Sequence, residues 1–249
     1  AIDEEVDGVL FAGDLVESMN ARFEALRPLE QALASLKAAG IGAWAVVGNH
    51  DADALPSLAA TLDGLELIGL GGEWEVKTIE SEGRPVATIC GWSFPSRHHN
   101  SSPLPALIKN PPTRTEEGVP LLGLLHGDLN GSGSYAPFRR TELDNVPLDG
   151  WLLGHVPLPS LGPATLPGGQ PFGYLGSLVG LDGGEPGDHG PWIIHLEEGG
   201  SIRPEHVVNA PLRWEEVEIE VPEVVTPEAM GDLIMAKELE VAAALHNRG

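Results

Sequence analysis

Four short apolar runs in this chain each end in polar residues beside a glycine, and this feature constrains the fold more than any other. The runs end in "FAGD", "VVGNHD", "LLHGD" and "LLGH", and among their polar residues are Asp14, Asn49, His126 and His155. Helix-like stretches alternate with the first runs, which is typical of layered α/β proteins, where ligands gather at the carboxyl ends of strands. We therefore expect an α/β fold in which these four side chains converge.

The four side chains combine a carboxylate oxygen, an amide oxygen and two imidazole nitrogens. Such a mixed set of donors suits manganese, iron or zinc better than calcium. The neighbouring glycines let the backbone turn sharply and approach an ion. Each piece alone is more often a simple turn or a hydrogen-bonded histidine. The four pieces in this order, each after an apolar strand, point to a metal site.

Charge and cysteine content narrow the classes of function. Acidic residues outnumber basic ones 37 to 14, and the net charge is −23 at pH 7. A surface of this sign repels nucleic acid at long range, although a local basic groove or a metal site can still attract phosphate. The single cysteine, Cys90, excludes an intramolecular disulfide and fits a reducing compartment. No apolar run reaches about 18 residues, so we expect a cytoplasmic protein without a membrane span.

Other segments carry weaker signals of local structure. Residues 18–40 have helical spacing, with Gly40 as a C-terminal cap. Residues 95–120 are rich in proline and polar residues, which predicts a long surface loop with a helical turn near 104–108. Residues 212–221 alternate as an edge strand does. A helix is predicted after Thr226, which has the side chain of an N-cap and precedes Pro227.

The motif order resembles that of the calcineurin-like metallophosphoesterases, and most of all their DNA-repair exonuclease branch, the SbcD-type nuclease subunits. The stretch "LLHGDLNGSGSYAPFRRTELDNVPLDGWLLGH" is similar to that branch between its His-Gly and Gly-His motifs. The stretches "YLGSLVGLDGGEPGDHGPWIIHLEEGG" and "APLRWEEVEIEV" resemble the next segments of that branch. The resemblance implies a four-layer α/β/β/α sandwich at residues 1–206, truncated before its first strand. The beginning of a small α/β capping domain would come next, at residues 207–249.

The resemblance also implies a metal chemistry. The family uses two ions about 3.5–4 Å apart to clamp the phosphoryl group. By resemblance, Asp14 bridges the two ions, and Asn49, His126 and His155 complete the shell of the second metal. The cofactor we expect is a divalent metal, with Mn²⁺ as the leading candidate.

Catalytic and substrate-binding roles follow from the same resemblance. His50 would contact the phosphate and protonate the leaving oxygen, and Glu17 would orient His50. Asp51 is harder to assign: a structural role, in which it closes the turn, is supported as well as a role in the chemistry. Arg97 and His98 lie in the long loop and are candidates for binding substrate phosphate, with a solvated loop as the alternative.

The chain departs from the family pattern at two places. The family opens with an Asp-x-His motif, which has no match in "AIDEEVDGVLF". Its last motif is Gly-His-x-His, but here Gly154-His155-Val156 is followed by Pro157, which has no ligand atom. The shell of the first metal therefore keeps only Asp14. A missing first strand would leave backbone edges unpaired and lower the stability of this piece.

Two functions remain after these departures. The leading one is metal-dependent hydrolysis of a phosphoester substrate, with DNA ends as the expected substrate and an ATPase subunit as the expected partner. A homodimer is compatible with this interpretation. The alternative is a degenerate relative that binds one metal or none and serves as a scaffold or regulatory subunit. The chain has no phosphate-cradling glycine-rich loop, so any ATPase would be a separate subunit.

Overall fold

The computed structural model describes residues 1–17, 25–114, 116–162, 169–197, 200–222 and 226–246. A three-stranded parallel sheet has the order β1-β2-β3. β1 lies at its edge, with β2 as its one partner strand in the described ranges. The strands and the helices between them are β1 (Gly8–Phe11), α1 (Leu26–Ala38), β2 (Gly42–Ala45), α2 (Leu55–Ala59) and β3 (Leu65–Leu67).

A second sheet has five strands in the order β4-β5-β6-β7-β8. β4 pairs with β5 antiparallel, and the later pairs are parallel. A 3₁₀ turn, η1 (Leu70–Gly72), precedes it. The elements are β4 (Trp74–Ser81), β5 (Arg84–Trp92), α3 (Leu104–Lys109), β6 (Leu121–His126), α4 (Arg140–Leu143), β7 (Gly150–Gly154) and β8 (Phe172–Tyr174). The antiparallel hairpin of β9 (Trp192–Leu196) and β10 (Ile202–His206) comes after them in the chain.

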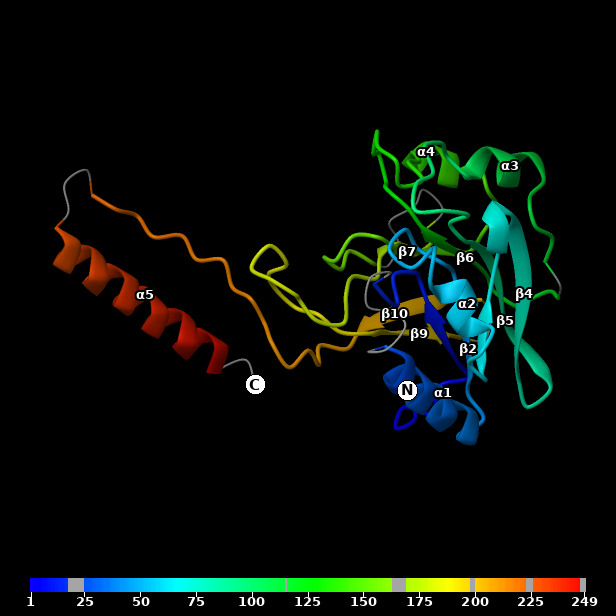
Figure 1. Ribbon diagram of the computed structural model, residues 1–249, viewed down its shortest axis with the longest axis horizontal. Helices are drawn as coiled ribbons and strands as arrows, with labels where there is room; N and C mark the ends of the chain where they lie inside the picture. The colour runs from blue at the N-terminus through cyan, green and yellow to red at the C-terminus, as the bar shows by residue number, and fades with distance from the viewer. Residues whose placement is uncertain (18–24, 115, 163–168, 198–199, 223–225, 247–249) are drawn as a thin grey trace.

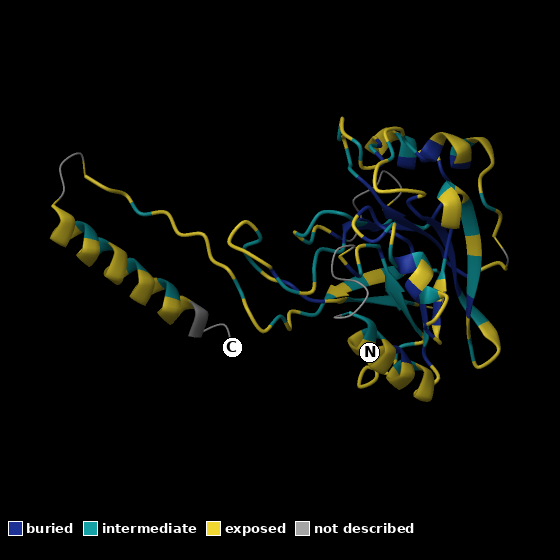
Figure 2. Ribbon diagram, viewed as in Figure 1, coloured by how far each residue is buried: buried dark blue, intermediate teal, exposed yellow. Residues whose placement is uncertain are grey.

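Alternating side chains bury both faces of each sheet. On β2, Ala43 and Ala45 pack toward α1 and α2, whereas Trp44 packs toward the second sheet. On β6, Leu122 and Leu124 face the core between the sheets, and Leu121 and Leu125 face α3 and α4. The helices and sheets thus follow one another as helix, sheet, sheet and helix, and the buried residues gather in the sheets and in the helices and loops that cover them (Figures 1 and 2). The predicted α/β class is confirmed.

The region after β10 differs from the prediction. Residues 207–222 form no strand, and they lead to the helix α5 (Pro227–His246), which lies away from the sheets (Figure 1). The edge strand predicted at 212–221 is therefore wrong, because an alternating segment becomes a strand only beside a partner backbone. The predicted start of α5 is correct, since the Ala229 N–H donates to Thr226 Oγ1 at 3.2 Å. No helix among the described residues is both long and apolar enough to span a membrane.

Candidate metal centre

The ends of β1, β2, β6 and β7 bring the four predicted ligands together. Asp14 and Asn49 lie in the loops just after β1 and β2, His126 is the last residue of β6, and His155 directly follows β7. One ligand atom from each of Asp14, His126 and His155 lies within 4.8 Å of the others. The structure therefore brings into one cluster side chains that are spread over most of the first two thirds of the chain.

Asn49 lies at the middle of this cluster. Its Oδ1 is 3.0 Å from His126 Nε2 and 3.2 Å from His155 Nδ1. His126 Nε2 is also 3.2 Å from Asp14 Oδ2. Asn49 and His126 are buried, whereas the Asp14 side chain keeps 27% of its surface exposed. The cluster thus has a buried base and an open side toward solvent.

The orientation of His126 suits it to bind a cation. Its Nδ1 lies 2.8 Å from the carbonyl oxygen of Ala12, and an N–H there donates to that oxygen. This bond fixes the ring and leaves Nε2 facing the oxygens of Asp14 and Asn49. Acceptor atoms this close repel one another unless a proton or a cation lies between them. The donor set of two oxygens and two nitrogens therefore fits a divalent metal such as Mn²⁺ or Zn²⁺.

The backbone at two of the ligands is strained. Asp14 has φ 54° and His155 has φ 111°. Positive φ is uncommon for residues other than glycine, and for a bulky residue it marks strain that the surrounding structure must hold. Such strain clusters at functional sites. Two of the six non-glycine residues with positive φ among the described residues are thus predicted ligands, and the bulky His155 departs furthest from the usual range.

Two glycines allow the strand ends to approach. A Cβ at Gly48 would lie 2.1 Å from Asp14 Oδ1, and one at Gly154 would lie 1.9 Å from the Ala12 carbonyl oxygen. Both distances are far below van der Waals contact. These two positions therefore need glycine so that Asn49 and His155, the next residues in the chain, can reach Asp14 and His126.

The ionisation of Asp14 and His155 favours cation binding. Burial alone would raise the pKa of Asp14, but when His126 is protonated its hydrogen bond and charge, helped by His50, outweigh burial and lower the pKa of Asp14 below 3.8. Burial lowers the pKa of His155, and the nearby charge of His126 lowers it further. At neutral pH the Asp14 carboxylate is therefore charged and the His155 imidazole is neutral, as metal ligands must be.

Asp51 joins the two loops that carry Asp14 and Asn49. Its Oδ2 accepts the N–H of Leu15 at 2.8 Å, and its Oδ1 accepts the N–H of Gly48 at 2.7 Å. The carboxyl group is fully buried, and this burial raises its pKa to about 6. These contacts favour the structural role of Asp51 over a role in the chemistry, because both of its carboxylate oxygens accept hydrogen bonds from backbone N–H groups.

His50 and Glu17 lie together on the open side of the cluster. His50 Nδ1 is 2.7 Å from Glu17 Oε2, and both side chains are about half exposed. The backbone N–H of His50 donates to Asp14 Oδ1 at 2.9 Å. The turn therefore ties the position of His50 to the carboxylate of Asp14 while its ring remains accessible.

Arg97 and His98 do not join the cluster. Arg97 Nε is 3.9 Å from Asp53 Oδ2, which is a loose ion pair on the surface. The ring of His98 lies 6.0 Å from the ring of Tyr135, whose own ring lies 5.3 Å from that of His155. His98 thus connects to the cluster through Tyr135, a residue that the sequence motifs did not single out.

Position 157 contributes backbone alone to this region. The carbonyl oxygen of Pro157 accepts the N–H of Ser177 at 2.8 Å. In the described ranges, Asp14, His126 and His155 form the one group of three or more acidic, histidine or cysteine residues close enough to share an ion. The described residues therefore supply a full set of donors for one ion.

Tyr174 supports the loop after His126. Its hydroxyl donates to the Gly127 carbonyl oxygen at 3.0 Å and accepts the Leu129 N–H at 2.8 Å. Burial raises the pKa of this phenol to about 12, so the hydroxyl stays protonated and remains a donor. No sequence signal points to this role, because Tyr174 lies far along the chain on β8.

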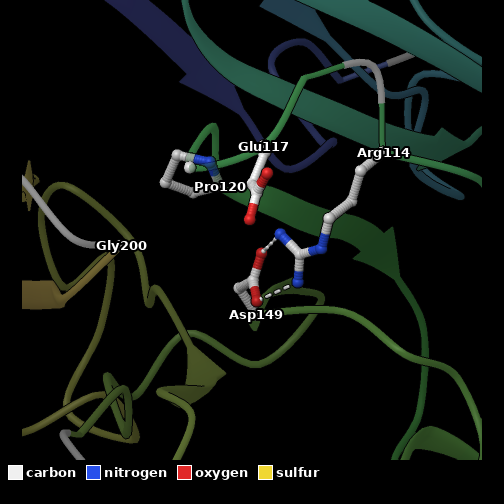
Figure 3. A pocket seen from close by; sticks show the side chains of 6 residues that line it. Arg114, Glu117, Pro120, Asp149 and Gly200 are labelled. Carbon is white, nitrogen blue, oxygen red and sulfur yellow. Dashed lines mark hydrogen bonds and ion pairs between the residues drawn. The ribbon is translucent and has the colours of Figure 1, made fainter.

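A pocket elsewhere in the protein is unrelated to this cluster. It lies before the amino ends of β6 and β7, opposite the ends that carry His126 and His155, and is lined by Arg114, Glu117, Gly118, Pro120, Asp149 and Gly200 (Figure 3). The guanidinium of Arg114 binds both carboxylate oxygens of Asp149 at 2.6 and 2.5 Å. Since this pair satisfies both groups, the pocket is best explained as part of the structural junction between strands.

Comparisons with known proteins agree with the geometry. A family model described as calcineurin-like phosphoesterase matches residues 1–159. "Uncharacterized metallophosphoesterase YhaO" of Bacillus subtilis (strain 168) is 28% identical over 261 residues, which cover 94% of this chain and 56% of that protein. "DNA double-strand break repair protein Mre11" of Methanosarcina mazei is 39% identical over 72 residues, 29% of this chain and 11% of that protein. The chain therefore spans about half the length of the first relative and a small part of the second.

Proposed function

The chain belongs to the calcineurin-like phosphoesterase family, and from this premise we propose that it is a metal-dependent phosphodiesterase acting on DNA ends. The observation that carries the proposal is the cluster of Asp14, Asn49, His126 and His155 at the carboxyl ends of four strands. We assign these four side chains as ligands of one divalent ion, with Mn²⁺ as the leading candidate.

A divalent ion bound there would supply Lewis-acid polarisation of the phosphoryl oxygens. His50 lies on the open side, where its ring is able to meet a phosphoester. Glu17 accepts a hydrogen bond from Nδ1, which orients the ring and leaves Nε2 to hold the proton that the leaving oxygen needs. Asp51 holds the two loops in register, so the ligands and His50 keep their relative positions.

DNA as substrate is supported by the name of the Methanosarcina relative, a DNA double-strand break repair protein. The similarity of residues 124–155 to the DNA-repair exonuclease branch supports the same substrate. The net charge of −23 opposes unaided binding of DNA, so we propose that an ATPase subunit assists it. We also propose that residues 207–249 begin a capping domain, since the Bacillus relative is much longer than this chain.

A second function is favoured by one specific observation. Pro157 stands where the family has a histidine ligand of the first metal, and it offers no side-chain donor. If one ion is insufficient for turnover, the chain would act as a scaffold or regulatory subunit that retains the fold and the metal.

Metal titration with parallel assays separates the two functions. The purified protein is titrated with Mn²⁺, the bound ions are counted, and hydrolysis of bis(p-nitrophenyl) phosphate and of linear DNA is measured. We expect one ion or more and turnover of both substrates. Loss of a general acid typically costs about 10²–10⁴-fold in rate, so His50→Ala should lower turnover by that factor while keeping the ion.

The matched control is His195→Ala, because His195 lies on β9 and its ring pairs with Glu205 at 3.0 Å, outside the cluster. This variant should keep the wild-type rate. Folded protein that binds Mn²⁺ without turnover at any concentration would establish the scaffold instead. Equal rates in wild type and His50→Ala would remove His50 from the proposed chemistry.

A further inference from the structure

An exposed aromatic ring lies directly beside the metal cluster. The ring of Tyr135 is 5.3 Å from that of His155 at an interplanar angle of 42°. The ring of His98 lies 6.0 Å from that of Tyr135 at an interplanar angle of 40°. Tyr135 keeps 37% of its surface exposed, although the chain contains only two tyrosines and the other, Tyr174, is buried. A partly exposed aromatic ring therefore lies next to a proposed metal ligand.

Backbone hydrogen bonds hold this ring in place. The N–H of His99 donates to the Ser134 carbonyl and the N–H of Ala136 donates to the His99 carbonyl, both at 2.8 Å. The N–H of Asp128 donates to the carbonyl of Tyr135 at 2.9 Å. The ring of His99 also packs 5.0 Å from that of Trp92, which is almost fully buried. Two loops from distant parts of the chain are thus joined and anchored to the core, so the rings have defined positions.

We propose that Tyr135 and His98 form a shelf on which a nucleobase stacks while its phosphodiester lies at the metal cluster. The inference rests on the proposed function and adds the kind of DNA end that the site accepts. A base stacks on the shelf only after it leaves its neighbour in the duplex, and a paired base must also break its pairing to do so. The site should therefore prefer a single-stranded or unpaired terminal nucleotide to a blunt, paired end.

The charge of the protein makes stacking the more plausible source of affinity. Contacts to phosphates need Lys and Arg, which are outnumbered 37 to 14 by acidic residues. Stacking on an aromatic ring does not depend on net charge, accepts every base, and contributes substantially for each base. A shelf beside the metal would thus contribute binding energy for DNA that the negative charge of the protein does not supply.

The direct test removes the base or the ring. The substrates are a thymidine dinucleotide and the same dinucleotide with both bases replaced by abasic residues, so that cleavage polarity does not matter. With Mn²⁺, we expect the wild type to show kcat/KM at least about tenfold higher for the base-bearing substrate, chiefly through a lower KM. Tyr135→Leu should bring that ratio close to one, whereas Tyr135→Phe should keep it.

Trp214→Leu is the matched control, because Trp214 has the same 37% exposure but lies on the segment after β10. It should keep the wild-type ratio. A wild-type ratio near one would overturn the shelf while leaving the phosphodiesterase proposal intact. An equal fall of both rates in Tyr135→Leu would overturn it as well, because Tyr135 would then only position His155.

Binding provides a readout that does not depend on turnover. A dinucleotide containing 2-aminopurine is added to protein loaded with Zn²⁺, a diamagnetic ion that suits the same donors. Stacking on Tyr135 should quench the fluorescence in wild type and Tyr135→Phe, and the apparent affinity should fall about tenfold or more in Tyr135→Leu. Equal quenching in all three proteins would contradict the shelf even if no substrate is hydrolysed.

Discussion

Gly154 is the single residue whose replacement should damage the metal cluster most directly. A Cβ there would lie 1.9 Å from the carbonyl oxygen of Ala12 and 2.9 Å from Nδ1 of His126. Because the closest atom is backbone, no side-chain rotation relieves the clash, and the ends of β1 and β7 must separate. We expect Gly154→Ala to weaken Mn²⁺ binding at least tenfold, measured by isothermal titration calorimetry, and to destabilise the fold by about 1–3 kcal/mol.

The control for this variant is Gly231→Ala. A Cβ at Gly231 meets no atom within 4 Å, and the residue lies inside α5. Alanine favours a helix over glycine, so this variant should be as stable as the wild type or slightly more stable. Unchanged Mn²⁺ affinity in Gly154→Ala would show that the approach of β7 to Ala12 does not shape the site.

At the scale of residues, sequence reasoning found the side chains that sit at strand ends. Asp14, Asn49, His126 and His155 were visible because each follows an apolar run and adjoins or follows a glycine. The residues that position them were not visible. Tyr135 reaches the cluster through loop pairing with His99, and such pairing between distant loops leaves no periodic signal in the sequence.

At the scale of elements, the hydroxyl of Tyr174 connects β8 to the loop after β6, and its contribution to the free energy of unfolding should be measurable. Tyr174→Phe removes a hydroxyl that serves Gly127 and Leu129, so a backbone carbonyl and a backbone N–H lose their partner. An unsatisfied buried polar group costs about 1–3 kcal/mol. We expect the free energy of unfolding in urea to fall by about 2 kcal/mol, with no change in the m-value.

Tyr135→Phe is the companion variant for Tyr174→Phe. It removes the same hydroxyl from an exposed ring, and surface changes of this kind usually stay within about 0.5 kcal/mol. A loss of stability in Tyr174→Phe no larger than in Tyr135→Phe would mean that water replaces the phenol at Gly127 and Leu129.

Strands that have a partner strand were predicted better than the alternating segment that has none. The strands that carry the ligands, the turn of α3 and the start of α5 follow from apolar spacing and capping. The strand predicted at 212–221 failed although its alternation is clear, because alternation records which residues could face a core and not whether a partner strand exists. β3 ends at Leu67, because the glycines that follow it at 69, 71 and 72 all have positive φ, and a strand needs negative φ.

At the scale of the whole molecule, Cys90 reports on global opening. It is fully buried on β5, and burial raises its pKa from 9.0 to about 12. The native thiol should therefore resist a disulfide reagent at pH 8 and react only as the protein unfolds. If Mn²⁺ binds the native state alone, it should slow this reaction in proportion to the stability that it adds.

The same thiol gives a pH dependence with a definite sign. Above pH 9 the unfolded chain loses the Cys90 proton, whereas the folded protein retains it up to about pH 12. The stability contributed by the protonated thiol is therefore full below pH 9 and is lost as pH rises through this window, by up to about 1.4 kcal/mol per pH unit. Denaturation curves of wild type and Cys90→Ala should show a steeper alkaline decline in the wild type. Parallel curves would contradict the buried, protonated thiol.

The φ of 111° at His155 has a consequence for how this chain evolves. Glycine would adopt that conformation without strain, so a substitution that stabilises the fold here would replace the histidine and remove its imidazole. A lineage that no longer needed the ion should therefore lose histidine at this position early. At this position the proposed cation site and the stability of the fold therefore place opposite demands on the sequence.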